Sequence, residues 1–310
     1  VAYWSLKDAG STGTETITRL YDAYYGIELG WSTIGSYVLT SKWGGWTETY
    51  SSTAQITETN LVFPVSVTVG AEPTDAAVTI DGAVYAGGQL PEIFTWAPGS
   101  LHELQVNATI QTAPGVRYVF VQWSDGDNSN PRNIFVDNNV SLTAEYVTQY
   151  YLTINRNPSY IGETTGAGWY NAGTLATATC TSPVPYISGT QYVFVNWTGD
   201  AFGTSTSLEL IMDGPKTITA NYKRQYNITF LQSGCSVTPN VVIDGVNYSV
   251  PCSFWFDEGS WHTVSYESPV SGGAGVQYIV KSPPSSPFKA SYSTTITGSY
   301  TTQFYIGITS

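Results

Sequence analysis

The chain has 310 residues, of which 11% are charged, and its formal net charge is −12 with a pI near 4.4. This charge excludes the basic surface that binds a nucleic-acid backbone, and there is no run of about 18 apolar residues that could span a membrane. An apolar content of 42%, with 14% aromatic residues, indicates packed cores rather than disorder.

Residues 1–63 are expected to form a β-rich region, read as an incomplete sandwich domain. The stretch "YVLTSKWGGW" (37–46) loosely resembles a Tyr-Val-Phe-x-x-Trp block found later in the chain. The window "TETITRLYDAYYGIEL" (14–29) places apolar residues at helical spacing. For that window helix and strand both stay open.

From residue 64 onward the chain consists of three repeats. "SLTAEYVTQYYLTI" (141–154) returns as "TITANYKRQYNITF" (217–230) and as "TITGSYTTQFYIGI" (295–308). A second block, "YVFVQWSDG" (118–126), returns as "YVFVNWTGD" (192–200). These periods divide the chain into repeat 1 at 64–148, repeat 2 at 149–224 and repeat 3 at 225–310.

Each repeat has the pattern of a small all-β domain. Short runs of Val, Ile, Tyr and Thr alternate with Asp-Gly, Pro-Gly and Gly-Gly turn signals. The fold class predicted is all-β, with tandem antiparallel Ig-like sandwiches in a rod. Trp123 and Trp197 are predicted core residues, and Lys281 is aligned with them in repeat 3.

The repeats meet at the motif Tyr-x-x-Gln-aromatic rather than at a Gly/Ser linker. The last strand of one repeat is therefore predicted to run almost directly into the first strand of the next. Connections of this kind restrict hinge motion, whereas Gly/Ser linkers behave as flexible coils.

The cysteines and Asn-x-Ser/Thr sequons indicate an exported protein. Cys235 and Cys252 bracket a predicted hairpin and are expected to form a disulfide, with two buried thiols as the alternative, and Cys180 is expected to be buried and inert. The sequons make four asparagines glycosylation candidates, and a fifth, Asn196, lies between aromatic residues that can block it. The candidates are Asn107, Asn139, Asn227 and Asn247.

No catalytic, cofactor-binding or metal-binding residue is predicted, and the protein is expected not to be an enzyme. His102 and His262 occupy matching places in "GSLH" and "GSWH", so repeat symmetry explains them as structural. The loop "DGDNSNPRN" (125–133) is rich in oxygen ligands, but Val136 stands where an EF-hand needs Glu.

The segment 302–310 has the pattern of a first strand without its domain. Phe304, Ile306 and Ile308 alternate on one face and are the candidate donor-strand residues. Insertion of such a strand into the incomplete N-terminal region of another copy would assemble subunits head to tail. Three alternatives stay open: the segment pairs within repeat 3, the chain is part of a longer array, or "VAYWSLKD" (1–8) is the donor.

The stretch "GTQYVFVNWTGDAFGTSTSLELIMDGPKTITANY" (189–222) resembles the tandem β-repeats of secreted and surface proteins of thermophilic archaea. These include repeats of S-layer-associated and thermopsin-like proteins, and more distantly the divergent internalin-type repeat of bacteria. The resemblance covers about 64–310 and implies a surface location and sandwich domains. Such modules serve enzymes, adhesins and filaments alike, so it does not fix a function.

The function predicted is that of a structural subunit of an extracellular filament, a pilus or thread, that serves adhesion. Its expected partners are further copies of itself and a cell-surface or glycan receptor. The chain starts at Val1 rather than Met, which suggests a mature form without its signal peptide. The alternative is an S-layer-associated protein or virion spike that does not polymerise.

Overall fold

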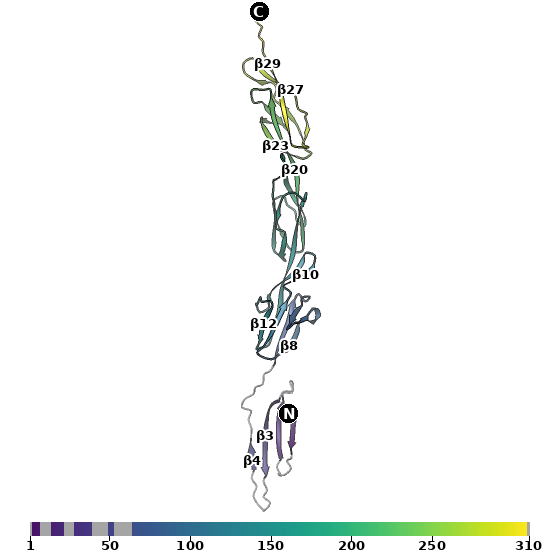
Figure 1. Ribbon diagram of the computed structural model, residues 1–310, viewed down its shortest axis with the longest axis vertical. Helices are drawn as coiled ribbons and strands as arrows, with labels where there is room; N and C mark the ends of the chain where they lie inside the picture. The colour runs from purple at the N-terminus through teal and green to yellow at the C-terminus, as the bar shows by residue number, and fades with distance from the viewer. Residues whose placement is uncertain (1, 7–13, 22–27, 39–48, 53–63, 309–310) are drawn as a thin grey trace, which may run out of the picture. The chain divides into compact units, whose positions relative to one another are not determined.

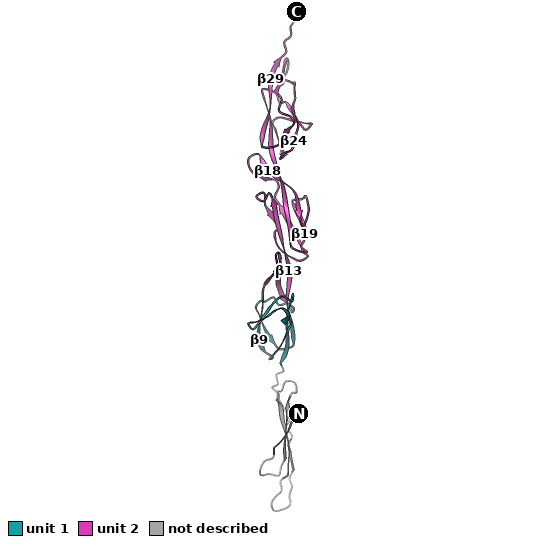
Figure 2. Ribbon diagram, turned by 90° about the vertical axis from the view of Figure 1, so that its right-hand side faces the viewer, with its two compact units in different colours: residues 1–106, 123–144 teal, residues 107–122, 145–310 magenta. Residues whose placement is uncertain are grey.

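The computed structural model describes residues 2–6, 14–21, 28–38, 49–52 and 64–308. It divides into two compact units: unit 1 contains 1–106 and 123–144, and unit 2 contains 107–122 and 145–310 (Figure 2). The regular elements among the described residues are all β-strands except for one short 3₁₀ helix at Gly87–Gln89. The predicted all-β fold is confirmed.

The N-terminal strands form an antiparallel four-stranded sheet in chain order. They are β1 (Ala2–Leu6), β2 (Thr14–Tyr21), β3 (Glu28–Val38) and β4 (Thr49–Ser52). The helix considered for 14–29 is wrong, because β2 occupies its first half. That half is rich in Thr and Ile, whose branched side chains favour strands over helices.

Repeat 1 contributes nine strands and contains the 3₁₀ helix. One sheet has the order β12-β9-β6-β7, and the other strands follow the order β8-β5-β13-β11-β10. The strands are β5 (Val65–Glu72), β6 (Val78–Ile80), β7 (Ala83–Tyr85), β8 (Glu92–Trp96), β9 (Ser100–Val106), β10 (Thr109–Ala113), β11 (Val116–Trp123), β12 (Arg132–Val136) and β13 (Val140–Asn157).

Repeat 2 repeats this arrangement, with β14-β16-β19 as one sheet and β15-β13-β20-β18-β17 as the other strand order. Its core contains Trp197, Leu152, Met212 and Ile218, all fully buried. The added strands are β14 (Thr164–Thr165), β15 (Gly168–Asn171), β16 (Leu175–Cys180), β17 (Val184–Pro185), β18 (Thr190–Gly199), β19 (Ser207–Ile211) and β20 (Lys216–Ser233).

Repeat 3 has the strand order β23-β20-β29-β27-β26, a three-stranded sheet β22-β21-β25 and the pair β24-β28. Its separate core includes the fully buried Phe230 and Ile228. The added strands are β21 (Asn240–Ile243), β22 (Val246–Ser249), β23 (Cys252–Asp257), β24 (Trp261–His262), β25 (Val264–Tyr266), β26 (Val270–Ser271), β27 (Val276–Ser282), β28 (Phe288–Lys289) and β29 (Thr294–Phe304).

The two long strands β13 and β20 each belong to two successive repeats (Figure 1). The expected boundaries at 148/149 and 224/225 fall inside them. In β20, alternate residues are buried on both sides of the boundary: Tyr222 in the core of repeat 2, Tyr226 just beyond the boundary, and Ile228 in the core of repeat 3. A strand of period two thus fills two cores with the same face.

The Asp-Gly turn signals are confirmed at two hairpins. Asp81 and Asp244 have φ of 49° and 48°, and the following Gly82 and Gly245 both have φ of 82°. Left-handed values at both central residues are those of the tight hairpin turn that matches strand twist, and Gly tolerates them without a Cβ clash.

The core role of Trp123 and Trp197 is also confirmed, since both are fully buried. Their indole N–H groups donate to the carbonyls of Ser129 (3.1 Å) and Ser205 (2.9 Å). These matching bonds satisfy the one polar atom of each ring.

The alignment of Lys281 with these tryptophans is wrong by two residues. Val280 lies opposite Tyr300 and Ser282 opposite Ser299, so Lys281 is an extra residue in a bulge. Val195 has the same place between Phe194 and Asn196. The register assigns Pro283 to the tryptophan position, and aromatic residues of other strands, Phe230 and Phe288 among them, contact one another in this core.

We predict that Trp123→Ala and Trp197→Ala each lower the free energy of unfolding by about 3–5 kcal/mol, because each leaves a large cavity. Lys281→Ala, at an exposed bulge, is the control and should change it by less than about 0.5 kcal/mol. Denaturant unfolding followed by tryptophan fluorescence measures both. A tryptophan variant as stable as wild type would contradict the burial.

Candidate assembly interface

A glutamine of the Tyr-x-x-Gln motif connects repeats 2 and 3 inside unit 2. The Gln225 side chain accepts a hydrogen bond from Gln191 Nε2 of β18 (2.9 Å). Its own Nε2 donates to Asp257 Oδ1 of β23 (2.7 Å). The first partner belongs to the preceding repeat and the second to the following one, so one amide ties both to the shared strand.

Gln149 makes the equivalent pair of bonds at the preceding motif. It accepts from Arg117 Nε (2.8 Å) and donates to Asn171 Oδ1 (2.9 Å). The Arg117 guanidinium also stacks over the Trp169 ring, 4.2 Å from its centroid. Sequence reasoning found the glutamines but missed these partners, of which Asn171 and Asp257 hold matching places in "GWYNAG" and "FWFDEG".

Gln303, the third glutamine, has the first half of this arrangement. It accepts from Gln277 Nε2 of β27 at 2.9 Å. Two residues on, Tyr305 N–H donates to the Gly275 carbonyl (2.8 Å), as Asn227 N–H does to Gly189 (2.9 Å). Among the hydrogen bonds of the described residues, Gln303 Nε2 has no acceptor that corresponds to Asp257.

The residues after Gln303 are exposed, although several of their counterparts are buried or half-buried. Phe304, Ile306 and Ile308 are 72%, 81% and 92% exposed. The register equates Ile306 with Leu152 and Ile228, which are 0% and 1% exposed. The segment 304–308 therefore has the apolar alternation of a first strand, without a core to bury it.

A cavity of about 590 Å³ lies beside this segment. Gln277, Gln303, Phe304 and Tyr305 line it, together with the turn that contains Gly273 and Gly275. In the joint between repeats 2 and 3, the equivalent glutamine is Gln225, which donates a hydrogen bond to Asp257 of the next repeat.

The structure shows how the two candidate donor segments pair within one chain. Thr302–Phe304 pair with β27, so this part belongs to repeat 3. Residues 305–308 are not in a strand, and residues 309–310 lie outside the described residues. At the other end, β1 (Ala2–Leu6) pairs with β2. The rest of the N-terminal candidate lies outside the described residues.

The two histidines lie in equivalent hydrogen-bonded chains. His262 Nδ1 contacts Asp244 Oδ2 and Nε2 contacts Ser260 Oγ, both at 2.6 Å. In repeat 1, His102 contacts Asp81 (2.7 Å) and Ser100 (2.8 Å) in the same way. Each aspartate is in a hairpin turn, so the chains fasten the turns to β24 and β9.

This order of side chains resembles a catalytic Ser-His-Asp triad, but the serine in repeat 3 does not donate its hydroxyl proton to the histidine. Ser260 Oγ donates to the Asp257 carbonyl (2.6 Å), so its proton does not point at the imidazole. The arrangement favours the structural role expected from repeat symmetry.

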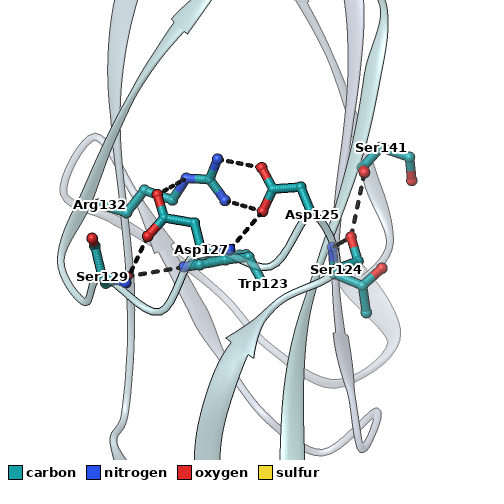
Figure 3. A network of polar contacts seen from close by, with 8 residues as sticks. Trp123, Ser124, Asp125, Asp127, Ser129, Arg132 and Ser141 are labelled. Atoms are coloured by element: carbon teal, nitrogen blue, oxygen red, sulfur yellow. Dashed lines mark hydrogen bonds and ion pairs between the residues drawn. The ribbon is translucent and has the colours of Figure 1, made fainter.

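The oxygen-rich loop 125–133 is closed by its own arginine (Figure 3). Arg132 forms a two-bond ion pair with Asp125, including Nη1–Oδ1 at 2.8 Å, and Nε lies 3.5 Å from Asp127. The guanidinium holds the pKa of Asp125 below its usual range. No cluster of three or more potential metal-ligating residues occurs in the described part of the chain. Arg132 occupies the carboxylates that a calcium ion would need.

All three cysteines are free thiols in the structure. This differs from the disulfide expected between Cys235 and Cys252. Both pack, half-buried, against the core of repeat 3, where they act as small apolar side chains. Burial raises the pKa of the Cys252 and Cys180 thiols, which disfavours their thiolates.

The candidate glycosylation sites differ in exposure. Asn107, Asn139 and Asn247 are exposed, the last in the hairpin strand β22. Asn227 is half-buried within β20, and Asn196, also half-buried, accepts a hydrogen bond from Asn221 (3.1 Å). A bulky glycan fits the three exposed positions better.

Comparison with known families supports a surface-protein repeat. The model of the divergent InlB B-repeat domain matches residues 152–226, which covers most of repeat 2 and the first two residues of repeat 3. No curated protein matches the chain significantly. No helix among the described residues has the length and apolar character to cross a bilayer.

We predict that Gln225→Ala lowers the free energy of unfolding of repeat 3 by about 1–3 kcal/mol, because it removes two hydrogen bonds of about 0.5–1.5 kcal/mol each. Gln303→Ala removes one such bond and is the matched control, with about half the effect. Denaturant titration followed by hydrogen exchange of β23 measures both. Equal effects of the two variants would contradict the two-sided role of Gln225.

We also predict that Asp244 contributes acid-dependent stability. The hydrogen bond from His262 lowers the pKa of Asp244 in the folded protein. A lowered folded pKa stabilises above the unfolded value, about 3.9, and this contribution disappears as the pH falls through the folded pKa. Asp244→Asn should therefore melt earlier than wild type at pH 7, with a difference that shrinks below about pH 4. A difference that is constant with pH would contradict this.

Proposed function

We propose that the protein is a structural subunit of an extracellular filament that assembles head to tail by β-strand donation and serves adhesion. The observation that carries the proposal is the exposed segment 304–308, which has the apolar phase of a first strand and follows half of an inter-repeat joint. The match of repeat 2 to a surface-protein repeat supports the extracellular setting.

The acceptor site for this strand belongs to a second copy of the chain. Within one copy, the first-strand position is filled by β5 in repeat 1, β13 in repeat 2 and β20 in repeat 3. The four-stranded sheet β1–β4 has outer strands, β1 and β4, that each pair on one side within the described residues. Such an edge offers backbone donors and acceptors to an added strand.

The energetics favour a durable contact. Burying Phe304, Ile306 and Ile308 would contribute about 1.5–3 kcal/mol for each side chain, before main-chain hydrogen bonds. Because donor and acceptor surfaces differ, the interface is heterologous and grows an open filament. Adhesion is a purpose that such a filament serves at the cell surface.

The test is assembly of a chain with Ile306→Asp. A charge at a position meant for burial should abolish filaments in electron micrographs and leave monomers with wild-type unfolding, since 306 is exposed in the monomer. Thr301→Asp, at an exposed residue paired inside β29, is the control and should assemble normally.

Three further outcomes separate the alternatives. A synthetic "TQFYIGITS" peptide should cap growing ends if 302–310 is the donor. Normal filaments from the Ile306→Asp variant would refute donation by this strand. Monomers from both wild type and variant would favour the non-polymerising surface protein.

A further inference from the structure

A pocket of about 400 Å³ opens at the joint between repeats 2 and 3. Its wall combines tyrosine rings with four charged side chains of both signs. The volume lies in the range of small-molecule sites, which pair apolar surface with a few placed polar groups. All its residues belong to unit 2.

The tyrosine side chains of the pocket range from buried to exposed. Tyr192 and Tyr222 are buried at 2% and 9% exposure, whereas Tyr160 is 60% exposed. The Tyr160 and Tyr192 hydroxyls lie 3.3 Å apart, and the two rings meet edge to face. An exposed tyrosine ring fixed over a pocket offers a flat π face to the C–H groups of a ligand.

Hydrogen bonds within the protein hold the polar side chains of the pocket in place. Arg224 donates from Nε and Nη2 to the Tyr192 hydroxyl, at 2.8 and 2.6 Å, and from Nη1 to Glu258 Oε1 at 3.1 Å. Tyr226 O–H also donates to Glu258 Oε1 (2.9 Å). Among the described residues both bonds to Glu258 fall on Oε1, so Oε2 is open to a ligand hydroxyl.

The charges cancel. Lys223 pairs with Asp257 at 2.6 Å, and Arg224 pairs with Glu258. An anionic or cationic ligand would disrupt one of these pairs, whereas a neutral polyol needs only directional donors and acceptors. Carboxylate oxygens and guanidinium N–H groups bind hydroxyls through charge-assisted hydrogen bonds.

This constellation is specific to one joint. Arg224 lies at the centre of β20, where the register places Thr148 in β13 and Thr302 in β29. Glu258 corresponds to Ala172 in repeat 2 and to Pro98 in repeat 1. The hydrogen bonds that stabilise all the joints need neither side chain, so the pair points to a separate role.

We propose that this pocket binds a neutral sugar residue of a glycan, which stacks on Tyr160 and donates a hydroxyl to Glu258. The inference rests on the proposed adhesive function, for which it names the chemical class of the receptor. Glu258 accepts from the sugar through Oε2, and Arg224 holds both Glu258 and the Tyr192 hydroxyl in place.

The experiment is saturation-transfer NMR and titration calorimetry on the full chain, with methyl glycosides of glucose, galactose and mannose and with inorganic phosphate as the anionic probe. We expect at least one glycoside to bind and phosphate not to. Tyr160→Ala and Glu258→Gln should each weaken that glycoside at least tenfold. Phe202→Ala, which removes a 76% exposed ring of the same repeat outside the pocket, is the control and should bind as wild type does.

Tyr160→Phe keeps the ring and should retain most of the affinity, which separates stacking from loss of the hydroxyl. Absence of glycoside binding, preference for phosphate, or unchanged binding in both pocket variants would overturn the inference. Filaments are recorded on the same samples. A chain that polymerises without binding sugars refutes this inference alone, and one that binds sugars without polymerising refutes the proposed assembly alone.

Discussion

The structure depends on one constraint: a β-strand places every second residue on the same face, and β20 uses this to serve two cores. Ile218, Ala220 and Tyr222 enter the core of repeat 2, and Ile228 and Phe230 that of repeat 3. A one-residue slip would expose all five side chains at once. The register of each repeat is therefore tied to that of its neighbour, with Arg224 between the cores on the same face.

Much of the fold follows from local sequence signals. The Asp-Gly turns, the buried tryptophans and the strands that pass between repeats depend on residues adjacent in the chain. The window 14–29 could not be decided because its apolar spacing fits a helix while its Thr and Ile residues favour a strand. The tryptophan alignment in repeat 3 failed because a bulge and a shifted core are properties of pairing between distant strands.

The candidate assembly interface was also predictable only in part, namely where its residues are adjacent in the chain. The alternation of Phe304, Ile306 and Ile308 is visible in the sequence, and so is the recurrence of the glutamine. The partners of that glutamine are contributed by other strands, about 30 residues away on either side, so only the structure shows that Gln303 has one partner where Gln225 has two. The pocket proposed to bind a sugar combines residues from 158 to 258, and no local motif marks it.

The parallel pairing of β20 with β29 has a mechanical consequence. Ile228–Ser233 lie beside Thr294–Ser299, so the strand by which the chain enters repeat 3 and the strand by which it leaves run side by side in the same direction. Tension along the chain would load the hydrogen bonds between these strands in shear, so that they resist together rather than opening one after another. The same geometry recurs where β13 pairs in parallel with β20. Repeats 2 and 3 should therefore each resist a pulling force along their strands before they unfold.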